Sequence, residues 1–316
     1  MQFVKIVRST FLAGICLLLI GLAAGAVYQA VASALDMMRN PAPGKLVDVG
    51  GFRLHINCAG QGEPAVIFDS GLADDSIAWY KVQPQVAKLT QACSYDRAGL
   101  GWSDPSPNPR TSTAMVKELH SLLKAANVHP PYILVGHSLG GMNMRLYAYS
   151  YPGEVVGLIL VDSSSPGQFR SMPAVQAYNA SFFRHQRYFQ ATMLFGWPRI
   201  NGWCDKWPPE VREQRKTTEC RRQPWITHVA EYERFGESSR EVSKASTLGN
   251  LPLIVLSHDT STPGPVARLW AQMQKDLAQL STHSTLQVVP GGTHNLQDDH
   301  PSVIIDAVKA EVEEAR

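Results

Sequence analysis

Residues Val135 to Gly141 read VGHSLGG, a G-x-S-x-G motif placed directly after the apolar run 132–135. A helix-compatible stretch, 139–150, follows it. Where a strand reverses sharply into a helix, glycines beside the central serine leave room for a strained turn that exposes its hydroxyl. The pattern therefore predicts Ser138 as a nucleophile. Such a serine also needs a base to take its proton and donors for the resulting oxyanion.

Composition excludes several classes of function. The 316-residue chain is 44% hydrophobic and 18% charged, so it can bury a large core. Its net charge is +2, and no basic stripe with interleaved aromatics is present, so we expect no nucleic-acid partner. The H-E-x-x-H motif is absent and the ten histidines are scattered. We therefore expect neither a metal nor a cofactor.

The N-terminal segment, residues 1–39, is predicted to associate with a membrane. Residues 11–27 carry no charge, and the segment stays weakly apolar to Leu35. This run is longer than the roughly 7 to 15 residues of a signal-peptide core, which favours an uncleaved single-pass anchor. Lys5 and Arg8 would hold the tail in the cytoplasm and place the folded domain on the extracytoplasmic side. The alternative is cleavage near Ala32-Ser33-Ala34, which would give a secreted or periplasmic protein.

The remaining chain has the pattern of an α/β protein. Residues 40–45 are expected to form a linker, since Pro and Gly break regular structure there. Short, mostly apolar strand-like runs occur at 46–49, 52–57, 65–68, 92–95, 132–135, 158–161, 253–256 and 286–289. From the third run onward they alternate with helix-like stretches at 78–89, 113–126, 139–150, 266–280 and 301–314. This order predicts a mostly parallel sheet with helices on both faces.

The interval 163–250 interrupts the alternation and predicts a helical cap. It contains no strand pattern, is dense in aromatic residues, and has more Lys and Arg than Asp and Glu. The core would then comprise residues 46–162 and 251–316.

Cysteine usage agrees with an oxidising compartment. Cys16 lies in the membrane segment, which leaves an even number for the domain. Two pairs are expected: the strand residues Cys58 and Cys93, and the cap residues Cys204 and Cys220. The alternative is four free, mostly buried thiols.

One histidine has the context of a general base. His294 lies in the turn 290–294, which follows the last predicted strand and contains two glycines. Parallel strands bring their carboxyl ends to one edge of the sheet, so this turn is expected near Ser138. We therefore predict that His294 takes the proton of Ser138.

Three separated motifs resemble the α/β-hydrolase fold superfamily, in its serine esterase and lipase branch. They are the segment GHSLGG, the upstream segment YDRAGLGWSD at 95–104, and the terminal Gly-x-x-His. The resemblance covers residues 46–312. It implies an eight-stranded sheet with a helical cap inserted after the sixth strand. A serine nucleophile also separates this chain from the haloalkane dehalogenase and epoxide hydrolase branches, which use aspartate.

The acid of the triad has two candidates. Asp259 follows the strand 253–256, where most of the superfamily places its acid, but its spacing departs from the usual Gly-x-x-Asp. Asp162 ends the strand before the cap, where a minority of relatives place theirs. Either carboxylate would orient His294 and stabilise its imidazolium form. We favour Asp162.

For the oxyanion hole, the resemblance points to backbone amides. Where the superfamily commonly has His-Gly after its third strand, this chain has Asp69-Ser70-Gly71-Leu72. The glycine is retained and the histidine is lost. The amides of Leu72 and Leu139 are therefore the predicted donors, and the segment 95–104 is expected to position the Leu72 loop.

These inferences predict a membrane-associated serine hydrolase that cleaves small-molecule carboxylic esters with an apolar acyl or aryl group, through an acyl-enzyme. The same triad also serves amidases, thioesterases, acyltransferases and carbon-carbon bond hydrolases, and some relatives are non-catalytic ligand-binding proteins. The sequence does not separate these alternatives.

Overall fold

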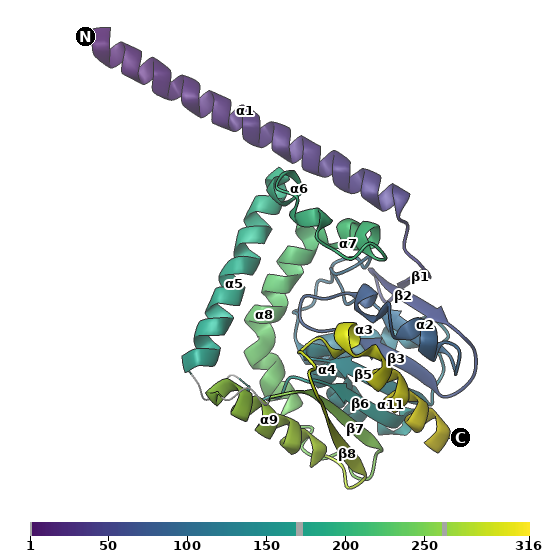
Figure 1. Ribbon diagram of the computed structural model, residues 1–316. Helices are drawn as coiled ribbons and strands as arrows, with labels where there is room; N and C mark the ends of the chain where they lie inside the picture. The colour runs from purple at the N-terminus through teal and green to yellow at the C-terminus, as the bar shows by residue number, and fades with distance from the viewer. Residues whose placement is uncertain (1, 169–172, 261–263) are drawn as a thin grey trace.

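A twisted eight-stranded sheet runs through the centre of the part of the chain that the computed structural model describes, residues 2–168, 173–260 and 264–316 (Figure 1). The strand order is β1-β2-β4-β3-β5-β6-β7-β8. β2 pairs antiparallel with β1 and β4, and all other pairs are parallel. The strands are β1 (Lys45–Asp48), β2 (Arg53–Ala59), β3 (Ala65–Asp69), β4 (Ala92–Tyr95), β5 (Tyr132–His137), β6 (Val155–Val161), β7 (Leu253–His258) and β8 (Ser284–Val289).

Helices cover both faces of the sheet, which confirms the predicted α/β architecture. One face packs against α3 (Ser112–Ala125), α4 (Leu139–Ser150), the second half of α8 (Arg222–Val242) and the end of α9 (Pro265–Ala278). The other face packs against α2 (Gln83–Val86) and α11 (Pro301–Glu314). Short helices occur at η1 (Ser76–Trp79), η2 (Pro152–Glu154) and α10 (Leu296–Asp299). Side chains of β3, β5 and β6 are buried on both faces, which explains their continuous apolar sequences.

One predicted helix is wrong as a single element. Residues 78–89 form the end of η1, a break, and then the single turn α2. Pro84 lies in the first turn of α2. It has no backbone N–H to donate to the preceding turn, so a longer helix cannot continue through it.

Between β6 and β7, the described residues of segment 163–250 contain helices and no strand. We call this the cap segment; its residues 169–172 lie outside the described part of the chain. Its helices are α5 (Pro173–Thr192), η3 (Met193–Phe195), α6 (Trp197–Ile200), η4 (Trp203–Asp205), α7 (Arg212–Glu219) and α8. Many of its aromatics pack on one another, among them Phe189, Trp203 and Trp225. These residues therefore form a small core of their own.

Helix α1 (Gln2–Arg39) extends away from the rest of the molecule, and its C-terminal half lies beside α6 and α7 (Figure 1). Among the described residues it is the one helix long and apolar enough to cross a membrane.

Two disulfides join the cysteine pairs expected from the sequence. Cys58 of β2 is bonded to Cys93 of β4, its direct neighbour across the antiparallel pair. Cys204 is bonded to Cys220 and ties η4 to the end of α7. Cys16 is free and exposed in α1.

Candidate active site

Ser138 occupies the turn between β5 and α4, in a backbone conformation that few non-glycine residues adopt. Its φ is 50° and its ψ is −117°. Such strain costs on the order of 1–3 kcal/mol and persists only where the surroundings enforce it. The turn is so tight that a Cβ atom at Gly136 would lie 2.6 Å from the carbonyl oxygen of Gly140. The glycines of the motif are thus required for the bend that presents the serine hydroxyl.

Four neighbouring strands place the polar groups of the site at one edge of the sheet. Ser138 follows β5, Asp162 follows β6, His258 ends β7, and His294 lies in the turn after β8. The Ser138 hydroxyl donates to Nε2 of His294 over 3.1 Å. Nδ1 of His294 donates to Oδ2 of Asp162 over 2.5 Å. The structure therefore joins Ser138, His294 and Asp162 in one chain of hydrogen bonds.

Asp162 accepts from more groups than His294 alone. The backbone N–H and Nδ1 of His258 donate to it over 3.0 and 2.8–2.9 Å, and Nε1 of Trp270 donates over 2.9 Å. The carboxylate is fully buried. Burial alone would raise its pKa, but the hydrogen bonds and charges of His258 and His294 hold the pKa well below the usual range. Asp162 therefore stays ionised. The other candidate acid, Asp259, accepts instead from the backbone N–H of Gly291 over 3.3 Å.

His137 is hydrogen-bonded to the turn that contains His294. Nε2 of His137 donates to the carbonyl oxygen of His294 over 2.8 Å. Burial, together with the nearby His294, lowers the pKa of His137 to about 4. A neutral His137 is a suitable donor to this carbonyl and adds no positive charge beside His294.

The predicted oxyanion donors belong to two different elements. Leu139 is the first residue of α4, and the N–H groups of the first helical turn have no acceptor within the helix. Leu72 belongs to the loop after β3, residues 70–75, which we call the β3 loop. Leu72 and Gly71 line the same cavity as Ser138. The β3 loop and the serine turn therefore border one cavity.

Arg97 holds the β3 loop in place, which is the role expected for the segment 95–104. Its guanidinium donates to the carbonyls of Ser70 and Gly71, each over 2.7 Å. It also forms buried ion pairs with Asp69 of β3 and with Glu231 of α8, each at 2.7 Å. Glu231 in turn accepts from the backbone N–H of Ala73 over 3.1 Å. Glu231 of α8 therefore holds the β3 loop on both sides of Leu72: through Arg97 at Gly71, and directly at Ala73.

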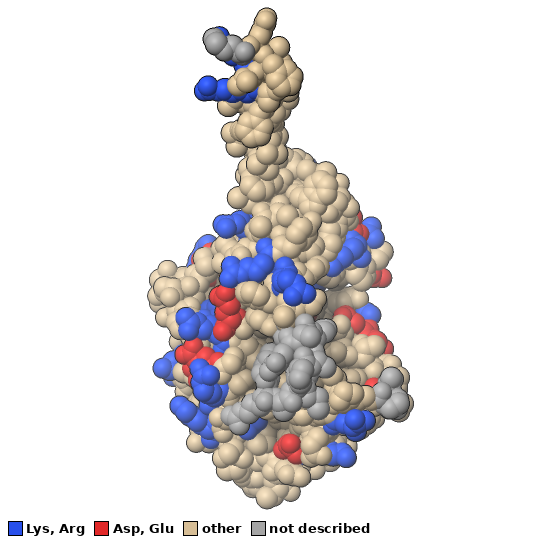
Figure 2. Space-filling model, turned by 90° about the vertical axis from the view of Figure 1, so that its left-hand side faces the viewer, with Lys and Arg blue, Asp and Glu red and all other residues tan. Residues whose placement is uncertain are grey.

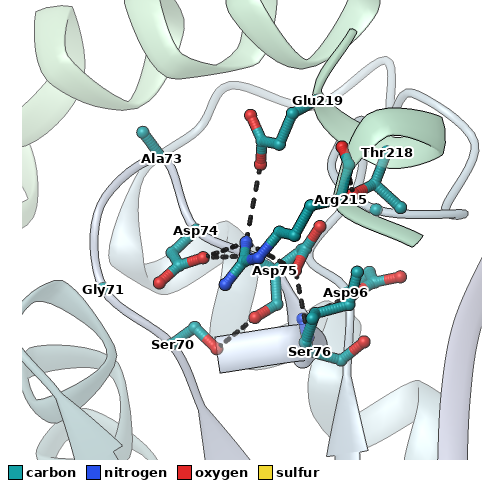
Figure 3. A network of polar contacts seen from close by, with 12 residues as sticks. Ser70, Gly71, Ala73, Asp74, Asp75, Ser76, Asp96, Arg215, Thr218 and Glu219 are labelled. Carbon is teal, nitrogen blue, oxygen red and sulfur yellow. Dashed lines mark hydrogen bonds and ion pairs between the residues drawn. The ribbon is translucent and has the colours of Figure 1, made fainter. Parts of the chain in front are cut away.

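A second buried network binds the β3 loop to α7 (Figure 3). Arg215 points between the carboxylates of Asp74, Asp75 and Glu219, at 2.6, 3.0 and 3.8 Å. Burial raises the pKa of Asp75 to about 6, and the charge of Arg215 opposes this shift. Burial also raises the pKa of Glu219. Several carboxylates around one cation make this contact sensitive to protonation.

A cavity of about 190 Å³ lies above Ser138 and His294. Its walls combine the β3 loop, the serine turn and the cap segment. Phe182 of α5 and Tyr232 and Phe235 of α8 supply its apolar side. Polar groups line the rest: Asp74, His137, Ser164, Gln168 and Asn295. Ser164 lies close to Ser138, with the two hydroxyl oxygens 3.3 Å apart.

Several residues of this site did not emerge from the sequence, among them His258, Ser164, Glu231 and Trp270. His258 and Ser164 lie two and three residues beyond the ends of predicted strands, so position could have marked them as candidates. Glu231 and Trp270 lie within helices whose local pattern does not show which side chain points to the site.

A mostly parallel sheet with a serine turn after β5 and a histidine turn after β8 defines the α/β-hydrolase fold. A family model described as Alpha/beta hydrolase family matches residues 66–307. The chain therefore belongs to that family.

Relatives differ in how much of their length this chain covers. It is 28% identical over 243 residues to the uncharacterized protein YqjL of Bacillus subtilis, covering 76% of this chain and 79% of YqjL. It is 31% identical over 131 residues to an uncharacterized vacuolar membrane protein of Saccharomyces cerevisiae, covering 35% of this chain and only 20% of that protein.

Solved structures share the fold at low identity. Cfl2 from Burkholderia cenocepacia has a TM-score of 0.69 at 20% identity, covering 85% of this chain and 95% of that one. The epoxide hydrolase CorEH has a TM-score of 0.67 at 18% identity, covering 86% and 98%. The haloalkane dehalogenase DbeA from Bradyrhizobium elkani has the same score and identity, covering 86% and 99%. At this level of identity, these similarities show the fold and do not identify the reaction.

Proposed function

We propose that this protein is a serine hydrolase that cleaves carboxylic esters. The observation that carries the proposal is the hydrogen-bonded chain from Ser138 through His294 to Asp162 at the floor of a cavity. Epoxide hydrolases and haloalkane dehalogenases of this fold attack with aspartate. A serine at the turn favours acyl transfer instead.

The proposed reaction has two stages. The Ser138 oxygen attacks the acyl carbon while its proton passes to Nε2 of His294. Asp162 holds Nδ1–H and stabilises the imidazolium that forms. The amides of Leu72 and Leu139 bind the oxyanion. When the ester C–O bond breaks, His294 returns the proton to the leaving alkoxide. A water molecule, deprotonated by His294, then attacks the acyl carbon. The bond from this carbon to the Ser138 oxygen breaks, His294 returns the proton to Ser138, and the acid is released.

The cavity favours a small acyl or aryl group. A volume of about 190 Å³ is comparable to that of an apolar cavity of about 150 Å³ that binds benzene in another protein. Phe182, Tyr232 and Phe235 offer apolar contacts. We expect acyl chains of a few carbons, or a single aromatic ring, to fit best.

We further propose that α1 is a retained membrane anchor and that the domain lies on the extracytoplasmic side. Buried polar contacts between α1 and the cap segment support retention of the helix, because cleavage near Ala34 would remove Gln29 from them. Lys5 and Arg8 at the N-terminal end favour a cytoplasmic tail. The two disulfides fit an oxidising compartment.

The test compares Ser138→Ala with Ser164→Ala, the neighbouring hydroxyl. Purified variants are assayed on p-nitrophenyl esters of increasing acyl length, and on a matched p-nitroanilide and thioester. We expect wild type and Ser164→Ala to hydrolyse short esters and to react with a fluorophosphonate probe. Ser138→Ala should lose activity on the order of 10⁶-fold and lose labelling. Full activity in Ser138→Ala would overturn the mechanism, and preference for the anilide or thioester would overturn the substrate class.

A further inference from the structure

One face of the second half of α1 packs against the cap segment. The covered residues follow one another at intervals of three or four, as on one side of a helix: Leu22, Gly25, Ala26, Gln29, Ala32, Ser33 and Asp36. A Cβ atom at Gly25 would lie 2.5 Å from the carbonyl oxygen of Phe195. Glycine therefore permits α1 to lie directly against η3.

Polar contacts fix this arrangement. Arg199 of α6 forms a buried ion pair with Asp36 at 2.6 Å. Arg199 and Gln29 both donate to the carbonyl oxygen of Cys220, each over 2.7 Å. Asn40 donates to Thr217 of α7 over 3.0 Å. Cys220 is itself held by the disulfide to Cys204. The helix and the cap segment therefore share one orientation.

The length of α1 places this contact at the edge of a bilayer. Figure 2 shows basic side chains near the free end of the helix and an uncharged shaft between them and the rest of the molecule. The uncharged run extends from Ser9 to Leu35. At about 1.5 Å per residue, a hydrocarbon core about 30 Å thick that begins near Ser9 ends about 20 residues later. Gly25, Tyr28 and Gln29 then lie at the far boundary, and tilt would carry more of the helix into the bilayer.

The elements that contact this boundary expose apolar side chains. Leu194 of η3 is 43% exposed, and Trp197 and Ile200 of α6 are 48% and 60% exposed. Arg199, between them in sequence, points inward to Asp36. Tryptophan and aliphatic residues are typical of the interfacial zone of membranes.

We propose that η3 and α6 form a membrane-docking face, which inserts Leu194, Trp197 and Ile200 into the lipid interface beside α1. The occupant is the lipid bilayer, because the face is continuous with a helix that is long and apolar enough to span it. This inference rests on the proposed membrane span of α1 and not on the proposed reaction. The cavity residue Phe182 lies about 18 Å from Leu194 along the helices, at about 1.5 Å per residue, so the docked cap holds the site close to the membrane.

The experiment measures lipid contact at single labelled cysteines in the full chain. A Cys16→Ser background leaves the other four cysteines in disulfides. Ile200→Cys and, independently, Leu194→Cys are labelled with a nitrobenzoxadiazole fluorophore and reconstituted into phosphatidylcholine vesicles with doxyl-labelled phosphatidylcholine. Lys309→Cys, on the exposed face of α11, is the matched control. Co-flotation that persists in alkaline carbonate establishes that α1 has inserted, because peripherally bound protein is released under these conditions.

We expect doxyl lipid to quench the labels at 194 and 200 at least threefold more than the label at 309, and iodide to show the reverse order. Equal iodide quenching at all three positions in floated protein would overturn the docking face and leave the anchor standing. Protection from iodide without quenching by doxyl lipid would show that a second copy of the chain covers the face, and would also overturn the proposal. Failure to float would overturn the anchor and the docking face together, whatever the activity on soluble esters.

Discussion

The Asp162 carboxylate accepts hydrogen bonds from His258, Trp270 and His294, and its substitution separates the two candidate acids. Asp162→Asn keeps the shape but presents an amide to His294, so the imidazole loses the partner that fixes its tautomer. We expect kcat to fall on the order of 10⁴-fold. Asp259→Asn should stay close to wild type, since Asp259 bonds to the Gly291 amide. Steady-state kinetics on one ester decide between them, and a comparable loss in Asp259→Asn would contradict the assignment.

His258 is a positioning residue that shares the Asp162 carboxylate with His294. Its own pKa is raised, chiefly by the hydrogen bond to Asp162. In His258→Ala the carboxylate loses the Nδ1–H donor of His258. We expect the acid limb of the kcat/KM profile of this variant to differ from that of the wild type, because the variant lacks the titration of His258, whose pKa the hydrogen bond to Asp162 raises.

His258→Asn is the matched variant, because its amide nitrogen takes nearly the place of Nδ1 and can still donate. It also lacks the titration of His258, so its acid limb should match that of the alanine variant. Identical profiles for the alanine variant and the wild type would remove His258 from this role.

At the residue scale, the sequence was informative where a strand end and a glycine turn coincide. Ser138 and His294 both have that local context. The choice between Asp162 and Asp259 stayed open because both follow strands at the same edge of the sheet. Side-chain direction decides such a choice, and here it depends on contacts with His258 and Trp270 from distant parts of the chain.

At the element scale, the contact between the β3 loop and α7 should depend on pH. The pKa of Asp75 rises from its ordinary value of 3.8 to about 6, because the group is buried and faces Asp74 and Asp96, with Arg215 in opposition. Between these two pH values the folded protein binds a proton that the unfolded chain has released. The stabilisation is therefore fully present below about pH 4 and is lost as pH rises through about 6.

Asp75→Asn imitates the protonated carboxyl. The free energy of unfolding of this variant, relative to wild type, should increase as pH rises from 4 to 7, by at most roughly 3 kcal/mol. Denaturant titrations at four pH values measure it, with the exposed Asp306→Asn as control. A difference that is constant with pH would contradict the assignment.

Strands were the elements that the sequence predicted best. All eight predicted runs overlap strands of the sheet, and the run 92–95 coincides with β4. Buried strands have continuous apolar sequences, and this local property needs no partner to be recognised. The break between η1 and α2 was missed because the apolar spacing of 78–89 suits a helix even though Pro84 interrupts it.

At the scale of the whole molecule, α1 and the cap segment should behave as one unit. Arg199→Ala removes the partner of Asp36 and the donors to Gln29 and Cys220. Loss of one partner of a buried ion pair costs about 3–5 kcal/mol. We expect faster amide hydrogen exchange in α6, α7 and residues 29–39 of the reconstituted protein. Arg240→Ala, an exposed arginine of α8, is the control and should leave exchange unchanged. Equal exchange in both variants would refute the coupling.

The sequence did not predict this coupling. Residues 1–39 and the cap were predicted as separate segments. The contact between Gln29 and Cys220 spans 191 positions and leaves no local sequence pattern. Apolar composition identified the helix, and only the folded chain shows that its polar residues face the cap.

Helix α8 belongs to both the cavity and the main core, which limits where cap segments could be exchanged between relatives to change substrate specificity. Its first half places Glu231 against Arg97 and Tyr232 at the cavity. Its second half places Phe235 at the cavity and buries Phe235 and Val242 in the main core. If the cap segment of a relative were inserted with its junction at residue 250, it would replace part of the main core together with the cavity wall. A chimaera joined at Ser164 and within α8, just before Phe235, would exchange Phe182 and Tyr232 of the cavity wall and keep Phe235, which belongs to both the cavity and the main core.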